Sequence, residues 1–77
     1  MNRVQTGTEA NGYARLSDRE REILILIAGG QSNQQIAERL VISTSTVQSH
    51  RAHLLQKLGL QTTADIVKYA VQHGLIG

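Results

Sequence analysis

The chain has 77 residues, a formal net charge of +2 and no cysteine. A chain of this length fits one domain with one small core, which neither a disulfide nor a thiolate-bound metal can reinforce. No apolar run reaches the roughly 20 residues of a membrane-spanning helix, and residues 1–15 lack the apolar stretch of a signal peptide. We therefore expect a cytoplasmic protein.

The charged residues are unevenly distributed along the chain. All six acidic residues lie outside the stretch 39–64, which contains Arg39, Arg51 and Lys57. A cationic half of this kind favours a nucleic-acid partner, but a mildly basic solvated surface has the same composition. Charge alone does not choose between these two interpretations.

The N-terminal part of the chain predicts a flexible segment followed by a first helix. Residues 1–15 are rich in Asn, Thr and Gly without an apolar period, which is typical of a flexible tail or linker, so we expect the folded domain to span 16–77. Ser17 and Glu20 have the spacing of a capping box at a helix start. The apolar period from Ile23 onwards then predicts a helix over 18–28.

Three further helices follow in the sequence. Ser32 and Gln35 repeat the capping pattern before a short helix over 33–40. Ser43 is a good N-cap for a helix over 44–58, and a last helix over 63–73 ends before a glycine. The apolar stripe of the third helix consists of Val47, His50, Leu54 and Leu58. With no segment typical of a strand, the sequence predicts an all-α four-helix bundle.

The second and third predicted helices have the spacing of a helix-turn-helix, with its core over 33–52. The two helices of this motif cross at close range, so the first needs a small residue and the second a compact apolar one. Ala37 and Val47 meet these needs, and Ile42 can fill the gap at the turn.

The outer face of the third helix is short and polar. Because the apolar stripe fixes which side faces the core, helical geometry places the following residues outside: Thr44, Ser45, Gln48, Ser49, Ala52 and Gln56. Glutamine can pair with adenine in the major groove, where a good bidentate pair contributes about 1–3 kcal/mol of discrimination. The free N–H groups at the helix start attract phosphate. An ordinary solvated helix has a similar face, so that alternative stays open.

Several motifs in the chain match one known domain. Residues 16–60 read LSDREREILILIAGGQSNQQIAERLVISTSTVQSHRAHLLQKLGL. This stretch resembles the LuxR-type helix-turn-helix, also called the FixJ/NarL or GerE-like domain, and the similarity extends to about Ile76. The resemblance implies a transcriptional regulator whose third helix enters the major groove and whose fourth helix forms a dimer on two half-sites.

The resemblance also implies individual DNA contacts. Base contacts fall at Gln48, Ser49 and Ala52, with Ser45 in some members. Phosphate contacts fall at Asn33, Gln34, Thr44, Ser45, Thr46, Arg51 and Lys57. Members often carry Lys where this chain has Gln34 and Gln48, and Asn where it has His53. Each lost phosphate contact makes the slope of log affinity against log salt concentration shallower by about 0.9. We therefore expect weak binding by the monomer with a shallow salt dependence.

The fourth predicted helix has more apolar surface than one side of a small bundle needs. We expect a dimer interface formed by Ile66, Val67, Ala70, Val71 and Leu75, with a purely intramolecular core as the alternative. The expected partners are double-stranded DNA and a second copy of the chain, with RNA polymerase as a further candidate. We expect no membrane contact and no small-molecule ligand.

Other residue patterns do not predict chemistry. His50 and His53 lack a third metal ligand nearby, so we expect His50 to pack inside with a ring nitrogen bonded to a backbone carbonyl, and His53 to face outward near phosphates. The run 19–22 reads as a salt-bridged helix surface in which Glu20 or Glu22 holds an arginine. The sequence therefore predicts neither an enzyme nor a cofactor.

Two other functions remain open. Region four of a bacterial sigma factor shares the first helix and the helix-turn-helix, but its sequences usually continue into an arginine-rich helix, whereas Gly59 is followed here by an amphipathic one. A protein-interaction module without DNA is conceivable because lysines are missing at Gln34 and Gln48. The linker-like start suggests the output domain of a two-component response regulator, with a free-standing protein as the alternative.

Overall fold

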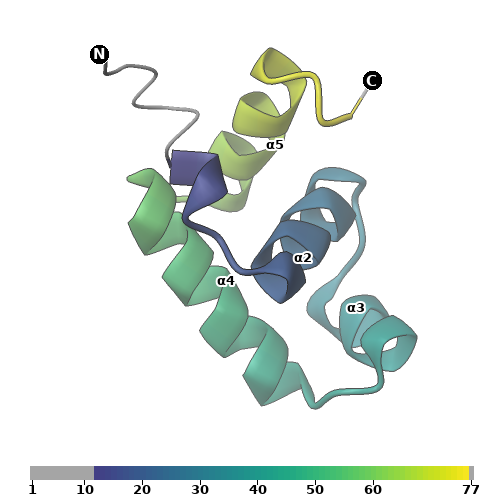
Figure 1. The fold of residues 1–77 in the computed structure, drawn as a ribbon. Coiled ribbons are helices and arrows are strands. Elements are labelled where there is room, and N and C mark those ends of the chain that lie inside the picture. The colour runs from purple at the N-terminus through teal and green to yellow at the C-terminus, as the bar shows by residue number, and fades with distance from the viewer. Residues whose placement is uncertain (1–11, 77) are drawn as a thin grey trace.

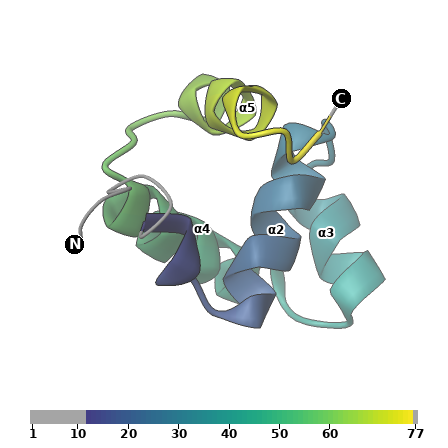
Figure 2. The same ribbon diagram turned by 45° about the horizontal axis from the view of Figure 1, so that its top comes forward.

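The computed structural model describes residues 12–76, which form a helical turn over 12–14 and four longer helices, with no strand in that range. The helices are α2 (Asp18–Ala28), α3 (Asn33–Leu40), α4 (Thr44–Leu58) and α5 (Thr63–Gln72). In Figure 1, α2 lies at the centre and contacts the other three, while α3 packs on α4. The turned view in Figure 2 shows α5 apart from the α3–α4 pair. The predicted all-α architecture is confirmed.

Local hydrogen bonds set the helix boundaries. Ser17 Oγ accepts from the Glu20 N–H at 3.1 Å, and Glu20 Oε1 accepts from the Ser17 N–H at 2.8 Å. Ser32 and Gln35 form the same reciprocal pair before α3. Both predicted capping boxes are therefore present. The last helix ends at Gln72, one residue before the predicted end.

The core is made of mostly aliphatic side chains from all four helices, together with Tyr69 and with Leu16, which precedes α2. Its large side chains with an exposed fraction below 2% are Ile23, Leu24, Ile36, Val47, Leu54 and Ile66. Ala37 of α3 is 6% exposed and Val47 of α4 is fully buried, as the helix-turn-helix interpretation requires. No helix between residues 12 and 76 combines the length and hydropathy of a membrane span.

The segment 12–15 differs from the expected flexible tail. Arg21 donates from Nε to the Tyr13 carbonyl at 3.3 Å and from Nη2 to the Ala14 carbonyl at 3.0 Å, and its guanidinium carbon lies 5.1 Å from the Tyr13 ring centroid. These bonds hold the helical turn against α2, a contact that the prediction of a tail did not include. The rest of the predicted tail, 1–11, lies outside the described residues.

Candidate nucleic-acid interface

The outer face of α4 carries the residues expected to read bases. Ser45, Gln48, Ser49 and Ala52 are all exposed, whereas Val47 and Leu54 on the opposite face are fully buried. This contrast fixes how α4 is rotated about its axis. Four short side chains with no acidic group are thus open to a partner that approaches α4 from outside the bundle.

A cluster of hydroxyl groups surrounds the start of α4. Ser43 Oγ lies 3.0 Å from Ser45 Oγ and 2.9 Å from Thr46 Oγ1, and it accepts from the Thr46 N–H at 3.1 Å. The first N–H groups of a helix have no partner within the helix. Together with Thr44, which is exposed, this end of α4 presents several donors to an anion.

Asn33 and Arg51 meet at the seam between α3 and α4. Arg51 Nη1 donates to Asn33 Oδ1 at 3.3 Å, and both residues are half-buried. Gln34 is exposed next to Asn33 at the start of α3. The structure therefore brings together two of the expected phosphate-contact residues, which are 18 positions apart in the sequence.

Lys57, another expected phosphate contact, binds a carboxylate of the same chain. Its Nζ lies 2.9 Å from Glu20 Oε1 and 3.4 Å from the Arg15 carbonyl oxygen, and its side chain is 40% exposed. Arg15 Nη2 in turn donates to the Lys57 carbonyl at 3.0 Å. The structure thus separates Lys57 from the Asn33–Arg51 pair and joins it to α2 and to Arg15 of the segment 12–15.

Glu20 is the one charged side chain in the core of the described residues, with 4% of its surface exposed. Burial raises its pKa, but the hydrogen bond from Lys57 and the backbone N–H of Ser17 lower it by more, so the pKa lies below its usual value. The expectation that Glu20 or Glu22 holds an arginine is met by Glu22, which pairs with Arg19 at 3.5 Å, whereas Glu20 pairs with Lys57.

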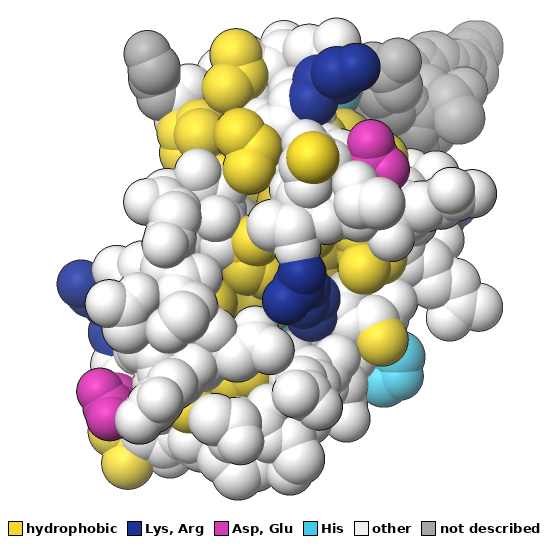
Figure 3. Space-filling model, turned by 180° about the vertical axis from the view of Figure 1, so that it is seen from behind, with side chains coloured by type: hydrophobic (Ala, Val, Ile, Leu, Met, Phe, Trp, Pro, Cys, Tyr) yellow, Lys and Arg dark blue, Asp and Glu magenta, His cyan; other side chains and the backbone are white. Residues whose placement is uncertain are grey.

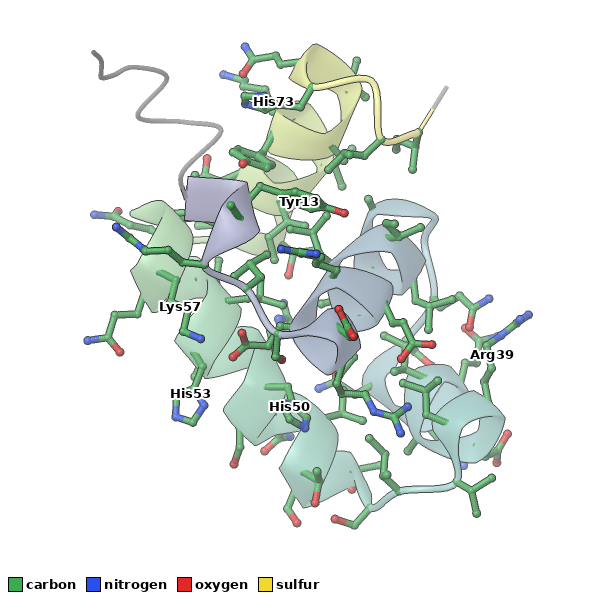
Figure 4. All side chains as sticks on the ribbon, viewed as in Figure 1. Tyr13, Arg39, His50, His53, Lys57 and His73 are labelled. Atoms are coloured by element: carbon green, nitrogen blue, oxygen red, sulfur yellow. The ribbon has the colours of Figure 1, made fainter. Side chains whose placement is uncertain are left out.

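The two histidines of α4 differ in exposure. His53 is exposed, as expected, and Figure 4 shows its ring directed away from the bundle. His50 is half-buried, but the expected hydrogen bond to a backbone carbonyl is not formed within residues 12–76. No group of three side chains suited to a metal ion occurs in that range.

The expected dimer interface on α5 is partly wrong. Ile66 and Ala70 have no exposed surface because α5 packs them against α2, so they belong to the core. Val71 is 56% exposed, and Val67 and Leu75 are half-buried. Hydrophobic side chains gather near this end of the molecule in Figure 3. The apolar surface left for a partner is therefore narrower than the sequence indicates.

One unusual backbone conformation lies between α3 and α4. Val41, the C-cap of α3, has φ 58° and ψ 50°, and 87% of its surface is exposed. A β-branched residue is rarely found in this left-handed region. This conformation could not be predicted from the sequence, because glycine or asparagine normally marks such a position.

Comparison with known proteins identifies the family. The family described as bacterial regulatory proteins, luxR family, matches residues 14–70. Transcriptional regulatory protein MctR of Rhizobium johnstonii is 45% identical over 74 residues, which cover 96% of this chain and 32% of MctR. Oxygen regulatory protein NreC of Staphylococcus carnosus is 44% identical over 75 residues, which cover 92% of this chain and 35% of NreC.

The same similarity extends to the fold. Full-length FixJ from B. japonicum superposes with a TM-score of 0.80 at 30% identity, over 90% of this chain and 34% of FixJ. The chain thus spans about a third of the length of these relatives. Since the family match covers most of the chain and includes all of α2, α3 and α4, the chain belongs to the luxR family of bacterial regulatory proteins.

Proposed function

We propose that this chain is a sequence-specific DNA-binding domain, the output part of a transcriptional response regulator, and that it carries out no catalysis. The observation that carries the proposal is the exposed, acid-free face of α4, which rests on a buried apolar face of the same helix. An α-helix fits the major groove of DNA, and short polar side chains allow it to approach the base edges closely. Membership of a family of bacterial regulatory proteins supports the same function.

The proposed contacts on α3 and α4 divide into two groups, one for base edges and one for phosphates. Gln48, Ser49 and Ala52, with Ser45 at the helix start, are proposed to meet base edges. The proposed phosphate contacts are Asn33, Gln34, Thr44, Thr46 and Arg51. The Asn33–Arg51 bond holds the guanidinium at the rim of α4, where a groove-bound helix meets the backbone. Lys57 contributes less than a free lysine, because Glu20 already neutralises its charge.

A second copy of the chain is the proposed partner on DNA. Val67, Val71 and Leu75 form the part of α5 that is open to such a contact. A symmetric pair would present two α4 helices to half-sites about one helical turn, or about 34–36 Å, apart. RNA polymerase is the proposed protein partner at a promoter, and the cytoplasm is the proposed location. The greater length of the relatives supports a further domain in the whole protein.

Titration of labelled duplex DNA tests this function. A regulator should bind random duplex weakly and in a salt-dependent manner, and it should bind duplexes selected from a random pool more tightly. Gln48→Ala should reduce affinity for the selected duplex by roughly 1–3 kcal/mol and relax the preference at one base pair. Gln72→Ala is the matched control, because Gln72 is an exposed glutamine on α5.

Two results would contradict the proposal. An interaction module that does not bind DNA would show no salt-dependent association with any duplex. Equal losses from Gln48→Ala and Gln72→Ala would show that α4 does not read the groove. If the duplexes selected from the random pool lacked two related half-sites, the proposed dimer would be contradicted but DNA binding would not.

A further inference from the structure

The two long sides of α4 carry different charged groups. Residues 46, 50, 53 and 57 are spaced three or four positions apart and therefore line one side of the helix, which we call the turn-side flank because Lys57 contacts the turn at 12–15. Arg51 lies on the other flank, where it meets Asn33 of α3. A helix in the major groove has a phosphate backbone along each side. In the proposed complex with DNA, each flank would therefore face its own DNA strand.

The turn-side flank has little free permanent charge along its length. Lys57 is paired with the buried Glu20 at 2.9 Å. Arg15 lies at the far end of the flank, where it donates to the Lys57 carbonyl. Between this end and the start of α4 lies His53, four residues before Lys57 and exposed. Figure 4 shows His53 directed outward from α4, whereas His50 lies on the side nearer α2.

The charged groups around His53 leave it free to meet a phosphate. Two charged residues of other elements contact this flank: Arg15, which donates to the Lys57 carbonyl, and Glu20 of α2, which binds the Lys57 ammonium. The carboxylates of α2 already have cationic partners: Asp18 with Arg21 at 3.9 Å, Glu20 with Lys57, and Glu22 with Arg19. Among the described residues, no carboxylate forms an ion pair with His53.

We propose that His53 is a proton-dependent phosphate contact on the DNA strand opposite to the one held by Asn33 and Arg51. The inference rests on the proposed DNA-binding function. A neutral imidazole offers one N–H donor and no charge, whereas the protonated ring offers two donors and a positive charge. Because binding of the proton and binding of DNA favour each other reciprocally, duplex affinity should rise as the pH is lowered.

The test uses the full 77-residue chain and a fluorescein-labelled random duplex, with anisotropy titrations at pH 5.5 and pH 8.0. One added phosphate contact steepens the slope of log affinity against log salt concentration by about 0.9. Raising the salt concentration from 50 to 200 mM should therefore weaken binding about 3.5-fold more at pH 5.5 than at pH 8.0. His53→Gln should abolish this difference and keep the affinity measured at pH 8.0. His53→Lys should give the steeper slope at both pH values.

His73→Gln is the matched control, because His73 lies at the end of α5, far from His53 in Figure 4. It should keep the pH dependence of the parent chain. Survival of the full pH dependence in His53→Gln would overturn the inference, as would equal salt slopes of the parent chain at the two pH values. Absence of duplex binding by the parent chain at either pH would contradict the proposed function itself. Circular dichroism at both pH values shows that each variant is folded.

Discussion

Lys57→Met is expected to destabilise the fold through Glu20. The substitution keeps most of the apolar length of the side chain but removes the ammonium 2.9 Å from a carboxylate whose side chain is 5% exposed. Breaking a fully buried pair costs about 3–5 kcal/mol, because one charge stays buried without its partner. Lys57 is 40% exposed, so water screens part of the interaction, and we expect a loss of about 1–2 kcal/mol at pH 7.

The stability lost in Lys57→Met should change with pH in a definite direction. The pKa of Glu20 is lower in the folded chain than its ordinary value of 4.5, so the pair stabilises the fold above that value and loses its effect as the pH falls through the folded-state pKa. In Lys57→Met the burial of Glu20 remains, and it raises the pKa. The difference in stability between the two proteins should therefore be largest near pH 7 and shrink in acid.

Urea denaturation followed by circular dichroism at pH 7 and pH 3.5 measures this difference. Lys68→Met is the control, because Lys68 is an exposed lysine on α5, and its loss should change stability by less than about 0.5 kcal/mol. Equal destabilisation by Lys57→Met at both pH values would refute the electrostatic reasoning. A Lys57→Met protein as stable as the parent chain at pH 7 would show that the ion pair contributes nothing net.

Four further substitutions, two of them compared as a pair, test local features. Val41→Asn should stabilise the chain by about 0.5–1 kcal/mol in thermal denaturation, because asparagine tolerates the left-handed conformation. Little packing is lost, since the Val41 side chain is 87% exposed. A loss of stability would contradict the inference that the backbone at Val41 is strained. Ser43→Ala should reduce stability by about 1 kcal/mol and weaken duplex binding, since it removes the cap of α4; unchanged melting would refute this role. Val71→Glu should weaken binding to a duplex with two half-sites but leave the monomer folded, because Val71 is exposed. Ala70→Glu should unfold the monomer, because Ala70 is buried. Equal melting temperatures of the two variants would contradict this difference in burial between Val71 and Ala70.

The helix boundaries could be predicted because their causes are local. Ser17 and Glu20 lie within one helical turn, so the sequence itself holds both partners of the capping box. The same proximity explains the N-cap at Ser43. The outer face of α4 followed from helical periodicity alone, once the apolar residues Val47 and Leu54 marked its inner face.

The contacts that the sequence did not predict join distant residues or depend on tertiary packing. Glu20 and Lys57 are 37 positions apart, and no periodic pattern links them. The apolar excess of α5 suggested an interface through Ile66 and Ala70, but only the packing of α5 on α2 shows that both are interior. The polar composition of 12–15 indicated a tail, because nothing in it revealed that Arg21 binds two of its carbonyl groups.

The reciprocal bonds between Arg15 and Lys57 have a mechanical consequence for α4. The middle of this helix is bonded to α3 through Arg51 and Asn33, and its last turn is bonded to Arg15. A displacement of residues 12–15 would therefore break two bonds to the last turn of α4, a part of the chain more than forty residues further along the sequence.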